Sequence, residues 1–108
     1  MAEIEAKTAK DVQEFLNKHK VAVVDCYATW CGPCVRIAPY VHKKCHEHGV
    51  ALIKVNVDEA QELSTGYGIQ AMPTFLVVKE KWDHVVLKKT GGSEGIVNEM
   101  VAEASKHK

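Results

Sequence analysis

The stretch VAVVDCYATWCGPC, residues 21–34, joins an apolar, strand-like run to a pair of cysteines. Val21–Tyr27 is rich in β-branched residues and too continuously apolar for a half-exposed strand, which predicts a central strand covered on both faces. Cys31 and Cys34 follow shortly after it and precede a helix-like segment. Two sulfur atoms are therefore expected at a corner between a strand and a helix.

The spacing Cys31-Gly32-Pro33-Cys34 fits two kinds of chemistry. At the start of a helix, two cysteines separated by two residues are close enough to form a reversible disulfide. The helix N-terminus also favours the thiolate, which is the form that attacks disulfides. The same spacing serves zinc sites, which usually need two further Cys or His ligands. The pair alone leaves redox and metal chemistry open.

Helices are predicted on both sides of this corner. Thr8-Ala9-Lys10-Asp11 has the form of a capping box and opens a helix to about Lys18, with apolar residues at helical spacing. Further helices are predicted from the cysteine pair to Gly49, from an Asp58 cap to about residue 66, and from Ser93 towards the C-terminal lysines.

Three more strands are predicted, at residues 50–57, 74–78 and 84–89, and the last two are most simply joined as a hairpin. This order of elements predicts an α/β fold in which helices cover both faces of a mixed sheet. A chain of 108 residues with 46% hydrophobic residues can bury a core without a metal or a disulfide. No linker or repeat divides it, so residues 1–108 are expected to form a single domain.

The charge balance narrows the classes of partner. Lys plus Arg and Asp plus Glu both number 14, and this zero formal charge argues against nucleic-acid or acidic-membrane binding. Met1–Glu5 lacks the basic start and apolar stretch of a signal peptide, and no run approaches membrane-spanning length. We therefore expect a soluble cytoplasmic protein. In a reducing cytosol, a disulfide that forms and breaks in turnover suits Cys31 and Cys34 better than a structural one.

Five features in order along the chain carry a family resemblance. They are Asp25, the run Trp30–Cys34, Pro39, Met72-Pro73-Thr74 and Gly91-Gly92. With them the chain resembles the thioredoxin family over nearly its whole length. Glutaredoxins usually have Pro-Tyr between the cysteines, and protein disulfide isomerase domains usually have Gly-His. The resemblance implies the thioredoxin fold, with a five-stranded mixed sheet in the order 1-3-2-4-5, four helices, and a cis Met72-Pro73 peptide facing the cysteines.

The resemblance also implies roles for the residues around the cysteines. Cys31 is expected to attack a client disulfide, and Cys34 to resolve the mixed disulfide. Gly32 and Pro33 are expected to tune the redox potential. Asp25 lies within an apolar strand, where burial should raise its pKa, and is expected to accept the proton of Cys34. The residue pattern without the family favours an ordinary strand-end carboxylate instead.

Two further sets of residues receive expected roles. Lys54, on the neighbouring strand, is expected to tune the charge of Asp25. A flat apolar rim is expected to bind a segment of the client beside Pro73. It consists of Trp30, Met72, Pro73, Gly91 and Gly92. Ordinary packing for Trp30 and turn geometry for the two glycines remain open as alternatives.

The implied activity is that of a protein-disulfide oxidoreductase, an electron carrier that maintains cell redox homeostasis. No nucleotide motif is visible, so the implied partner that recycles it is a separate NADPH-dependent thioredoxin reductase. Disulfide-containing clients such as peroxiredoxins are expected, with no bound cofactor, no bound metal, and a monomeric state. A non-catalytic protein-binding module with the same fold is the alternative, and a zinc-binding structural module is less favoured.

Other residues receive simpler interpretations. His42, Cys45 and His46 share a helix face at a spacing that suits metal ligands, but Cys45 is expected to fill a core position instead. Cys26 is expected to be buried and inert on the face of the strand opposite Asp25. Trp82 is expected to pack locally in the hairpin connection.

Two departures from the usual pattern lie in the helix after the cysteines. Val35-Arg36 places the basic residue one position later than many relatives do, which turns it by about 100° on a helix. This is expected to alter the electrostatics of partner binding. Lys44 stands where an apolar side chain would ordinarily recur, so the helix is expected to fray or shift near its end.

Overall fold

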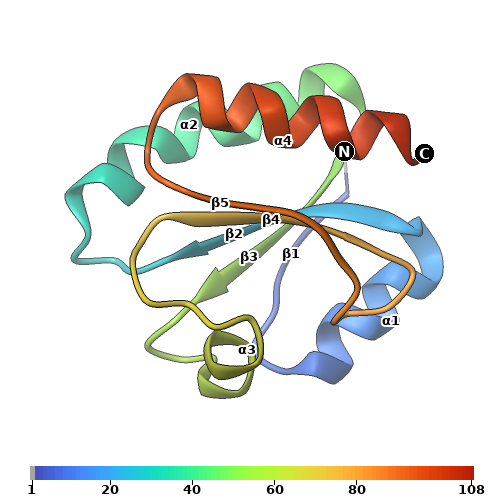
Figure 1. Cartoon of the computed structure of the whole chain (residues 1–108), viewed down its shortest axis with the longest axis horizontal. Coiled ribbons are helices and arrows are strands. Elements are labelled where there is room, and N and C mark those ends of the chain that lie inside the picture. Colours follow the sequence, from blue (N-terminus) through green and yellow to red (C-terminus); the bar gives the residue numbers. More distant parts are fainter. Residues whose placement is uncertain (1) are drawn as a thin grey trace.

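In the computed structural model, which describes residues 2–108, five strands form one mixed sheet in the order β1-β3-β2-β4-β5 (Figure 1). The strands are β1 (Glu3–Glu5), β2 (Val21–Tyr27), β3 (Ala51–Asn56), β4 (Thr74–Lys79) and β5 (Val85–Thr90). β1, β3 and β2 run parallel, whereas β4 is antiparallel to both β2 and β5. The strand order implied by the resemblance is confirmed, and so is the hairpin of the last two strands.

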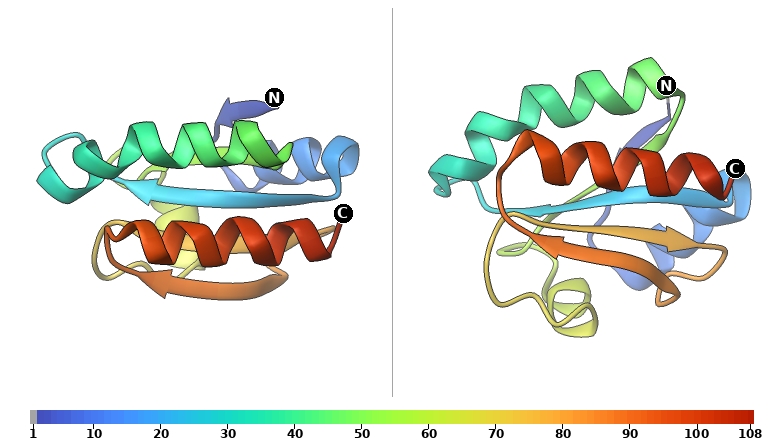
Figure 2. Two further views of the ribbon diagram at one scale, coloured as in Figure 1. Left: turned by 90° about the horizontal axis from the view of Figure 1, so that it is seen from above. Right: turned by 45° about the horizontal axis from the view of Figure 1, so that its top comes forward.

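The four helices of the described residues cover the sheet, and Figures 1 and 2 show them on both of its faces. They are α1 (Ala9–His19), α2 (Gly32–His48), α3 (Gln61–Gly66) and α4 (Glu94–Lys106). α2 and α4 lie side by side on one face, while α1 and α3 lie on the other. Successive residues of β2 therefore enter different cores, with Val23 packing beneath α2 and α4 and Val24 on the side of α1. This explains why β2 is apolar without alternation.

Three helix ends form as predicted. The Thr8 hydroxyl accepts from the Asp11 N–H at 3.1 Å while the Asp11 carboxylate accepts from the Thr8 N–H, which is a complete capping box. Gly49 ends α2 with a left-handed φ of 62°, which glycine adopts without steric penalty. Ser93 caps α4 through its hydroxyl.

Two predictions about helix ends were wrong. α3 begins after Ala60 rather than at an Asp58 cap, and no side chain caps it. α2 does not fray at Lys44 but continues to His48, because Lys44 pairs with Glu47 at 3.3 Å and lies over the Tyr40 ring. A long polar side chain can thus lie at a partly covered helix position when it finds local partners.

The sequence predicts no residue range for the first strand, which the structure places at Glu3–Glu5. β1 is three residues long, and pairing with β3 through Ile4 and Ile53 defines it. Trp82 packs against Tyr67 with ring centroids 5.6 Å apart, as predicted. Among residues 2–108, no helix is long and apolar enough to cross a membrane.

Candidate active site

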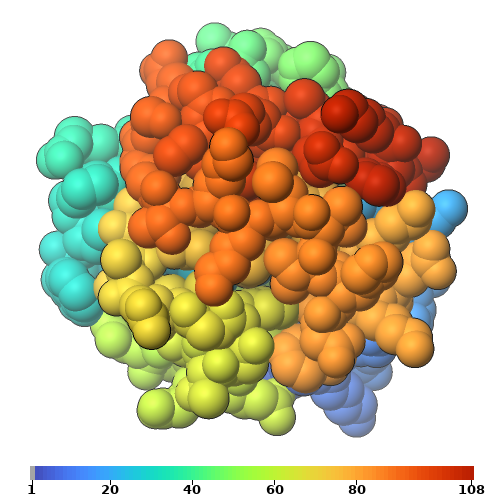
Figure 3. Space-filling view, in the orientation of Figure 1, coloured from blue at the N-terminus to red at the C-terminus, as the bar shows by residue number. Residues whose placement is uncertain are grey.

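Cys31 and Cys34 form a disulfide at the start of α2, with their Cα atoms 5.3 Å apart. Cys31 is the N-cap residue, and its sulfur accepts the Cys34 N–H at 3.2 Å. The segment from β2 to α2 that carries the pair projects at one edge of the molecule in Figure 3. Cys31 is only slightly more exposed than Cys34, at 7% against 3%. On reduction, a thiolate on Cys31 would lie at the positive end of the helix dipole.

The loop before β4 faces this disulfide. The Met72-Pro73 peptide is cis, as the resemblance implied, and the Met72 carbonyl oxygen lies 3.8 Å from the Cys31 sulfur. Gly91 has a φ of 137° and donates its N–H to the Pro73 carbonyl at 2.9 Å. These contacts place Met72 beside the Cys31 sulfur and tie Gly91 to the same loop.

Gly92 lies beside both Pro33 and Pro73 at the surface next to the disulfide. A Cβ atom at this position would lie 3.3 Å from the Pro33 Cβ and 3.7 Å from a Pro73 ring carbon. Glycine therefore lets the loop before α4 approach both prolines at once. The structure brings Gly92, Pro33 and Pro73 together, although the chain separates them widely.

Two apolar side chains protrude beside the cysteines. Trp30 is 70% exposed and Val35 is 59% exposed, which is unusual for residues of this kind. The Trp30 indole donates to the Asp58 carboxylate at 2.8 Å, so Asp58 orients the ring instead of capping α3. Sequence reasoning missed this role of Asp58.

The Arg36 guanidinium carries a positive charge at the start of α2, close to Gly32. A Cβ atom on Gly32 would lie 3.1 Å from an Arg36 guanidinium nitrogen, so the Arg36 side chain folds back over the first turn of α2. The displaced basic residue noted in the sequence therefore lies over Gly32, between the two cysteines in the chain, while Val35 is exposed.

Asp25 is buried behind the disulfide, with 2% of its surface exposed. It lines a cavity of about 210 Å³ together with Cys34, Val35 and Lys54. Its Oδ1 atom has no hydrogen-bond partner among the described residues. Burial raises the pKa of Asp25 to about 6, and the charge of Lys54 opposes that increase. The carboxyl can therefore take up and release a proton near neutral pH, in a cavity large enough for water.

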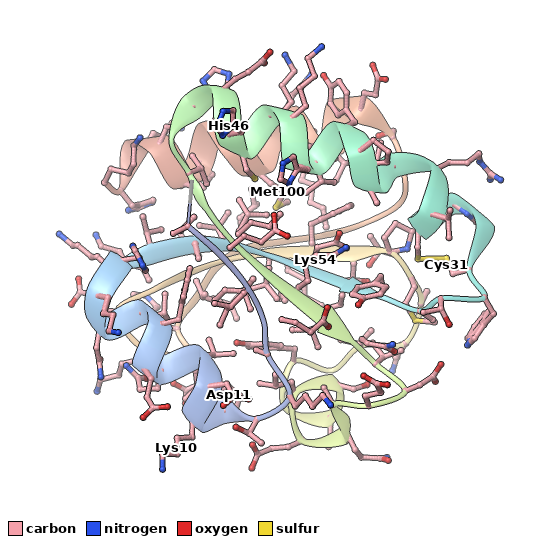
Figure 4. All side chains as sticks on the ribbon, turned by 180° about the vertical axis from the view of Figure 1, so that it is seen from behind. Lys10, Asp11, Cys31, His46, Lys54 and Met100 are labelled. Carbon is pink, nitrogen blue, oxygen red and sulfur yellow. A yellow bond between two sulfur atoms is a disulfide. The ribbon has the colours of Figure 1, made fainter. Side chains whose placement is uncertain are left out.

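Lys54 lies opposite Asp25 in the pairing of β2 with β3, and Figure 4 places it between the sheet and α2. Its ammonium nitrogen lies 4.7 Å from the centre of the Tyr27 ring, and the Tyr27 hydroxyl donates to Glu5 at 2.8 Å. Sequence reasoning missed Tyr27. Alternation along β2 was the available signal, because residues 25 and 27 share a face.

The residues weighed as metal ligands lie in other environments. Cys45 is fully buried in the core beneath α2 and α4, and His42 pairs with Glu3 at 2.9 Å. Within residues 2–108, no group of three or more His, Cys, Asp or Glu side chains is placed to hold a metal ion.

The two remaining thiols are buried, as predicted, and they lie in cores on opposite faces of the sheet. Burial raises the pKa of Cys45 to about 12 and raises that of Cys26 still further. Both thiols are therefore protonated and shielded, which makes them poor nucleophiles at neutral pH.

Comparisons with known proteins agree with this geometry. The family model described as Thioredoxin matches residues 3–102. Thioredoxin-T of Drosophila melanogaster is 44% identical over 71 residues, covering 64% of this chain and 45% of the fly protein. Thioredoxin-1 of Saccharomyces cerevisiae is 35% identical over 97 residues, covering 89% of this chain and 92% of the yeast protein. The chain thus spans about half the length of the fly relative and nearly all of the yeast one.

A solved structure matches over almost the whole fold. Reduced Schistosoma mansoni thioredoxin pre-protein superposes with a TM-score of 0.84 at 36% identity. The match covers 96% of this chain and 99% of that one.

Proposed function

The chain belongs to the thioredoxin family, and from that premise we propose that it is a protein-disulfide oxidoreductase that reduces disulfides in other proteins. The observation that carries the proposal is the Cys31–Cys34 disulfide at the start of α2, facing the Met72 carbonyl. A bridge so placed can accept two electrons and return them to a client. A non-catalytic binding module would leave this arrangement without a role.

The exchange proceeds in two steps. The Cys31 thiolate attacks one sulfur of the client disulfide, which forms a mixed disulfide and releases the other client sulfur as a thiolate. Cys34 then loses its proton and attacks the Cys31 sulfur, which breaks the mixed disulfide and frees the second client thiolate. The client gains two electrons and takes up two protons, and the Cys31–Cys34 bond is restored.

Asp25 is the acceptor for the Cys34 proton in this scheme. Both residues line the same cavity, and a carboxyl with a pKa of about 6 is ionised and ready to accept at neutral pH. Asp25→Asn is expected to slow resolution of a trapped mixed disulfide and to flatten its dependence on pH. Stopped-flow measurement of client release between pH 5 and 9 checks this. Resolution as fast as in the wild type across that range would remove Asp25 from the mechanism.

Client binding is assigned to the rim around the disulfide. The exposed Trp30 ring and the backbone of Met72 border the sulfurs, while Gly91 and Gly92 keep the neighbouring loop close to Pro73. An extended client segment can pair with this backbone without a deep pocket. Such a surface suits many clients, among which we include peroxiredoxins.

Pro33 and Gly32 are assigned to tuning of the redox potential. Pro33 lacks an N–H and restricts the first turn of α2, so it limits the hydrogen bonds available to the sulfurs. Pro33→His is expected to make the protein more oxidising, because the variant regains a backbone donor. Equilibration with glutathione measures this, and an unchanged potential would remove Pro33 from this role.

The wider cycle follows from the same chemistry. The oxidised pair must be reduced before each turnover, so we assign the chain a thioredoxin reductase that draws on NADPH. The protein would then act as a monomeric electron carrier, without a bound cofactor, in cytoplasmic redox homeostasis. Cell fractionation and sedimentation test its location and its state of association.

The decisive experiment is insulin reduction driven by NADPH and a thioredoxin reductase. Wild-type protein is expected to consume NADPH and precipitate the insulin B chain, and Cys31→Ser to abolish both. Cys45→Ala provides a matched control, because Cys45 is a buried thiol on the same helix. The control should retain full turnover. Absence of turnover by the wild type, or wild-type turnover by Cys31→Ser, would overturn the proposal.

A further inference from the structure

Three charged residues lie in one row across neighbouring strands. In the register of the sheet, Glu5 of β1 lies opposite Lys54 of β3, which lies opposite Asp25 of β2. Residues paired in this way point to the same face of the sheet, here the face covered by α2. The ammonium of Lys54 therefore has a carboxylate on each side, one buried and one exposed.

Neither carboxylate forms a direct ion pair with Lys54 within 4.0 Å. The ammonium instead lies 4.7 Å from the centre of the Tyr27 ring, a distance that suits a cation–π interaction. Tyr27 is two residues beyond Asp25 on β2 and lines the same cavity. The Tyr27 ring thus holds the Lys54 ammonium, which would otherwise be free to approach the Asp25 carboxylate.

The Tyr27 ring is itself held in place. Its hydroxyl donates to the Glu5 carboxylate at 2.8 Å. Burial, followed by this hydrogen bond, raises the pKa of Tyr27 well above its ordinary value, so the hydroxyl remains a donor at neutral pH. Glu5 therefore anchors the ring, and the ring positions the ammonium.

We infer that Tyr27, anchored by Glu5, is a positioning residue that keeps the Lys54 ammonium from pairing directly with Asp25, and so preserves the ability of Asp25 to accept a proton near neutral pH. A direct ion pair would stabilise the ionised carboxylate and weaken it as a base. This inference rests on the proposed function, in which Asp25 accepts the proton of Cys34. It concerns residues that act through Asp25 and do not touch the client.

The other charged or titratable groups that face Asp25 cannot substitute for the positioning of the Lys54 ammonium by Tyr27. From β1, the charges of Glu5 and Glu3 raise the pKa of Asp25, and Glu3 is in turn paired with His42 of α2. From α2, Cys34 shares the cavity and the buried Cys45 is neutral. The positive charge of Lys54 lowers the pKa of Asp25, so movement of this ammonium toward the carboxylate is the most direct way to lower that pKa further.

The test is a titration of the Asp25 carboxyl carbon by NMR in reduced protein, with Tyr27→Leu made in the presence and absence of Lys54. With Lys54 present, loss of the ring is expected to lower the Asp25 midpoint by about one pH unit or more, since an opposite charge at close range has an effect of this size. In the Lys54→Met background, the same change should move the midpoint by less than about a third of that.

A second variant separates the anchor from the ring. Tyr27→Phe keeps the ring and its volume but loses the bond to Glu5, so it should lower the Asp25 midpoint less than Tyr27→Leu does, and again only with Lys54 present. Tyr27→Phe also supplies the test if Tyr27→Leu does not fold. Equal shifts with and without Lys54 would mean that Tyr27 acts by excluding water. That outcome, or no shift with either variant, would overturn the inference.

Failure of the inference and failure of the proposed function remain distinguishable. The titration reports on Asp25 without any client, whereas insulin reduction reports on the activity itself. If the wild type reduces insulin but the titrations show no coupling between Tyr27 and Lys54, the proposed function stands and the inference is wrong. If the titrations show the coupling but the wild type reduces no insulin, the positioning role stands and the proposed function is wrong.

Discussion

At the scale of single residues, Asp25 opposes folding while serving the proposed chemistry. Asp25 is 2% exposed, and its Oδ1 has no hydrogen-bond partner among the described residues. Ionisation of such a group is unfavourable in the folded chain and unhindered in the unfolded one. The site therefore retains a destabilising charge at neutral pH, as expected where a buried acid has a function.

Replacement of this acid should stabilise the oxidised protein in a pH-dependent way. The folded pKa is raised from 3.8 to about 6, so between these values the native state binds the proton that the unfolded state has lost, and stability falls as pH rises. At pH 8, Asp25→Asn is expected to gain on the order of 3 kcal/mol over the wild type. The gain should vanish below about pH 4.

Urea unfolding at pH 4, 6 and 8 measures the gain, with Asp83→Asn as the exposed control. The control should be nearly neutral at each pH. A gain for Asp25→Asn that is the same at pH 4 and pH 8 would show that ionisation of Asp25 is not its source.

Gly92 gives a second prediction at this scale. A methyl group there would meet Pro33 at 3.3 Å, so Gly92→Ala should push Pro33 or the loop away from the client-binding surface. Misplacement of reacting groups by a fraction of an ångström is expected to lower kcat/KM for insulin reduction by about tenfold. Gly95→Ala is the matched control, because the nearest atom lies 3.9 Å away. Equal activity of the two variants would contradict the proposed close fit at Gly92.

At the scale of helices and strands, local pattern predicted most boundaries to within about two residues. Thr8, Gly49 and Ser93 ended or began helices as predicted, because capping depends on a few neighbouring atoms. β1 was not located from its residues, because three residues bounded by exposed glutamates become a strand only by pairing with β3. Asp58 was assigned to the wrong partner because its bond to Trp30 spans 28 residues.

The candidate site also divides into residues that the local sequence marks and residues that only long-range contacts bring together. The cysteine pair was visible in the sequence from its spacing, whereas the residue pattern alone favoured an ordinary strand-end carboxylate at Asp25, and its expected role came from the family resemblance. The positions of Met72, Pro73 and Gly92 around the sulfurs came from the family resemblance. Alternation along β2 puts Tyr27 on the same face as Asp25, but its contacts with Glu5 and Lys54 need three strands in register, which no local pattern encodes.

The capping box gives a prediction for α1. Thr8→Ala leaves the Asp11 N–H without its side-chain acceptor, which is expected to reduce the free energy of unfolding by about 1 kcal/mol. Chemical denaturation at pH 7 measures the loss. Thr65→Ala, at an exposed position in α3, is the control and should change stability much less. Insulin reduction should be unaffected by Thr8→Ala at 25 °C, because α1 covers the face of the sheet opposite α2.

At the scale of the whole molecule, the sheet separates two cores, and each contains one cysteine outside the active site. Cys26 lies in the core that includes Phe15 and Leu16 of α1, and Cys45 lies in the core beneath α2 and α4. Both are fully buried, whereas the reactive pair lies at the edge where β2 meets α2. The fold therefore leaves Cys31 and Cys34 at that edge for the proposed redox chemistry and shields Cys26 and Cys45 from it.

Thiol labelling tests this separation in the intact molecule. In reduced native protein at pH 7.5, iodoacetamide is expected to modify Cys31 first. Cys26 and Cys45 should react at least about a thousandfold more slowly, because burial leaves a very small thiolate fraction and labelling requires opening of a core. In concentrated urea, all four thiols should react at comparable rates, as mass spectrometry of timed samples would record. In Cys31→Ser/Cys34→Ser protein, the native state should remain unlabelled over the same period. Rapid native labelling of Cys26 or Cys45 there would mean that its core opens readily, and the division between reactive and protected thiols would not hold.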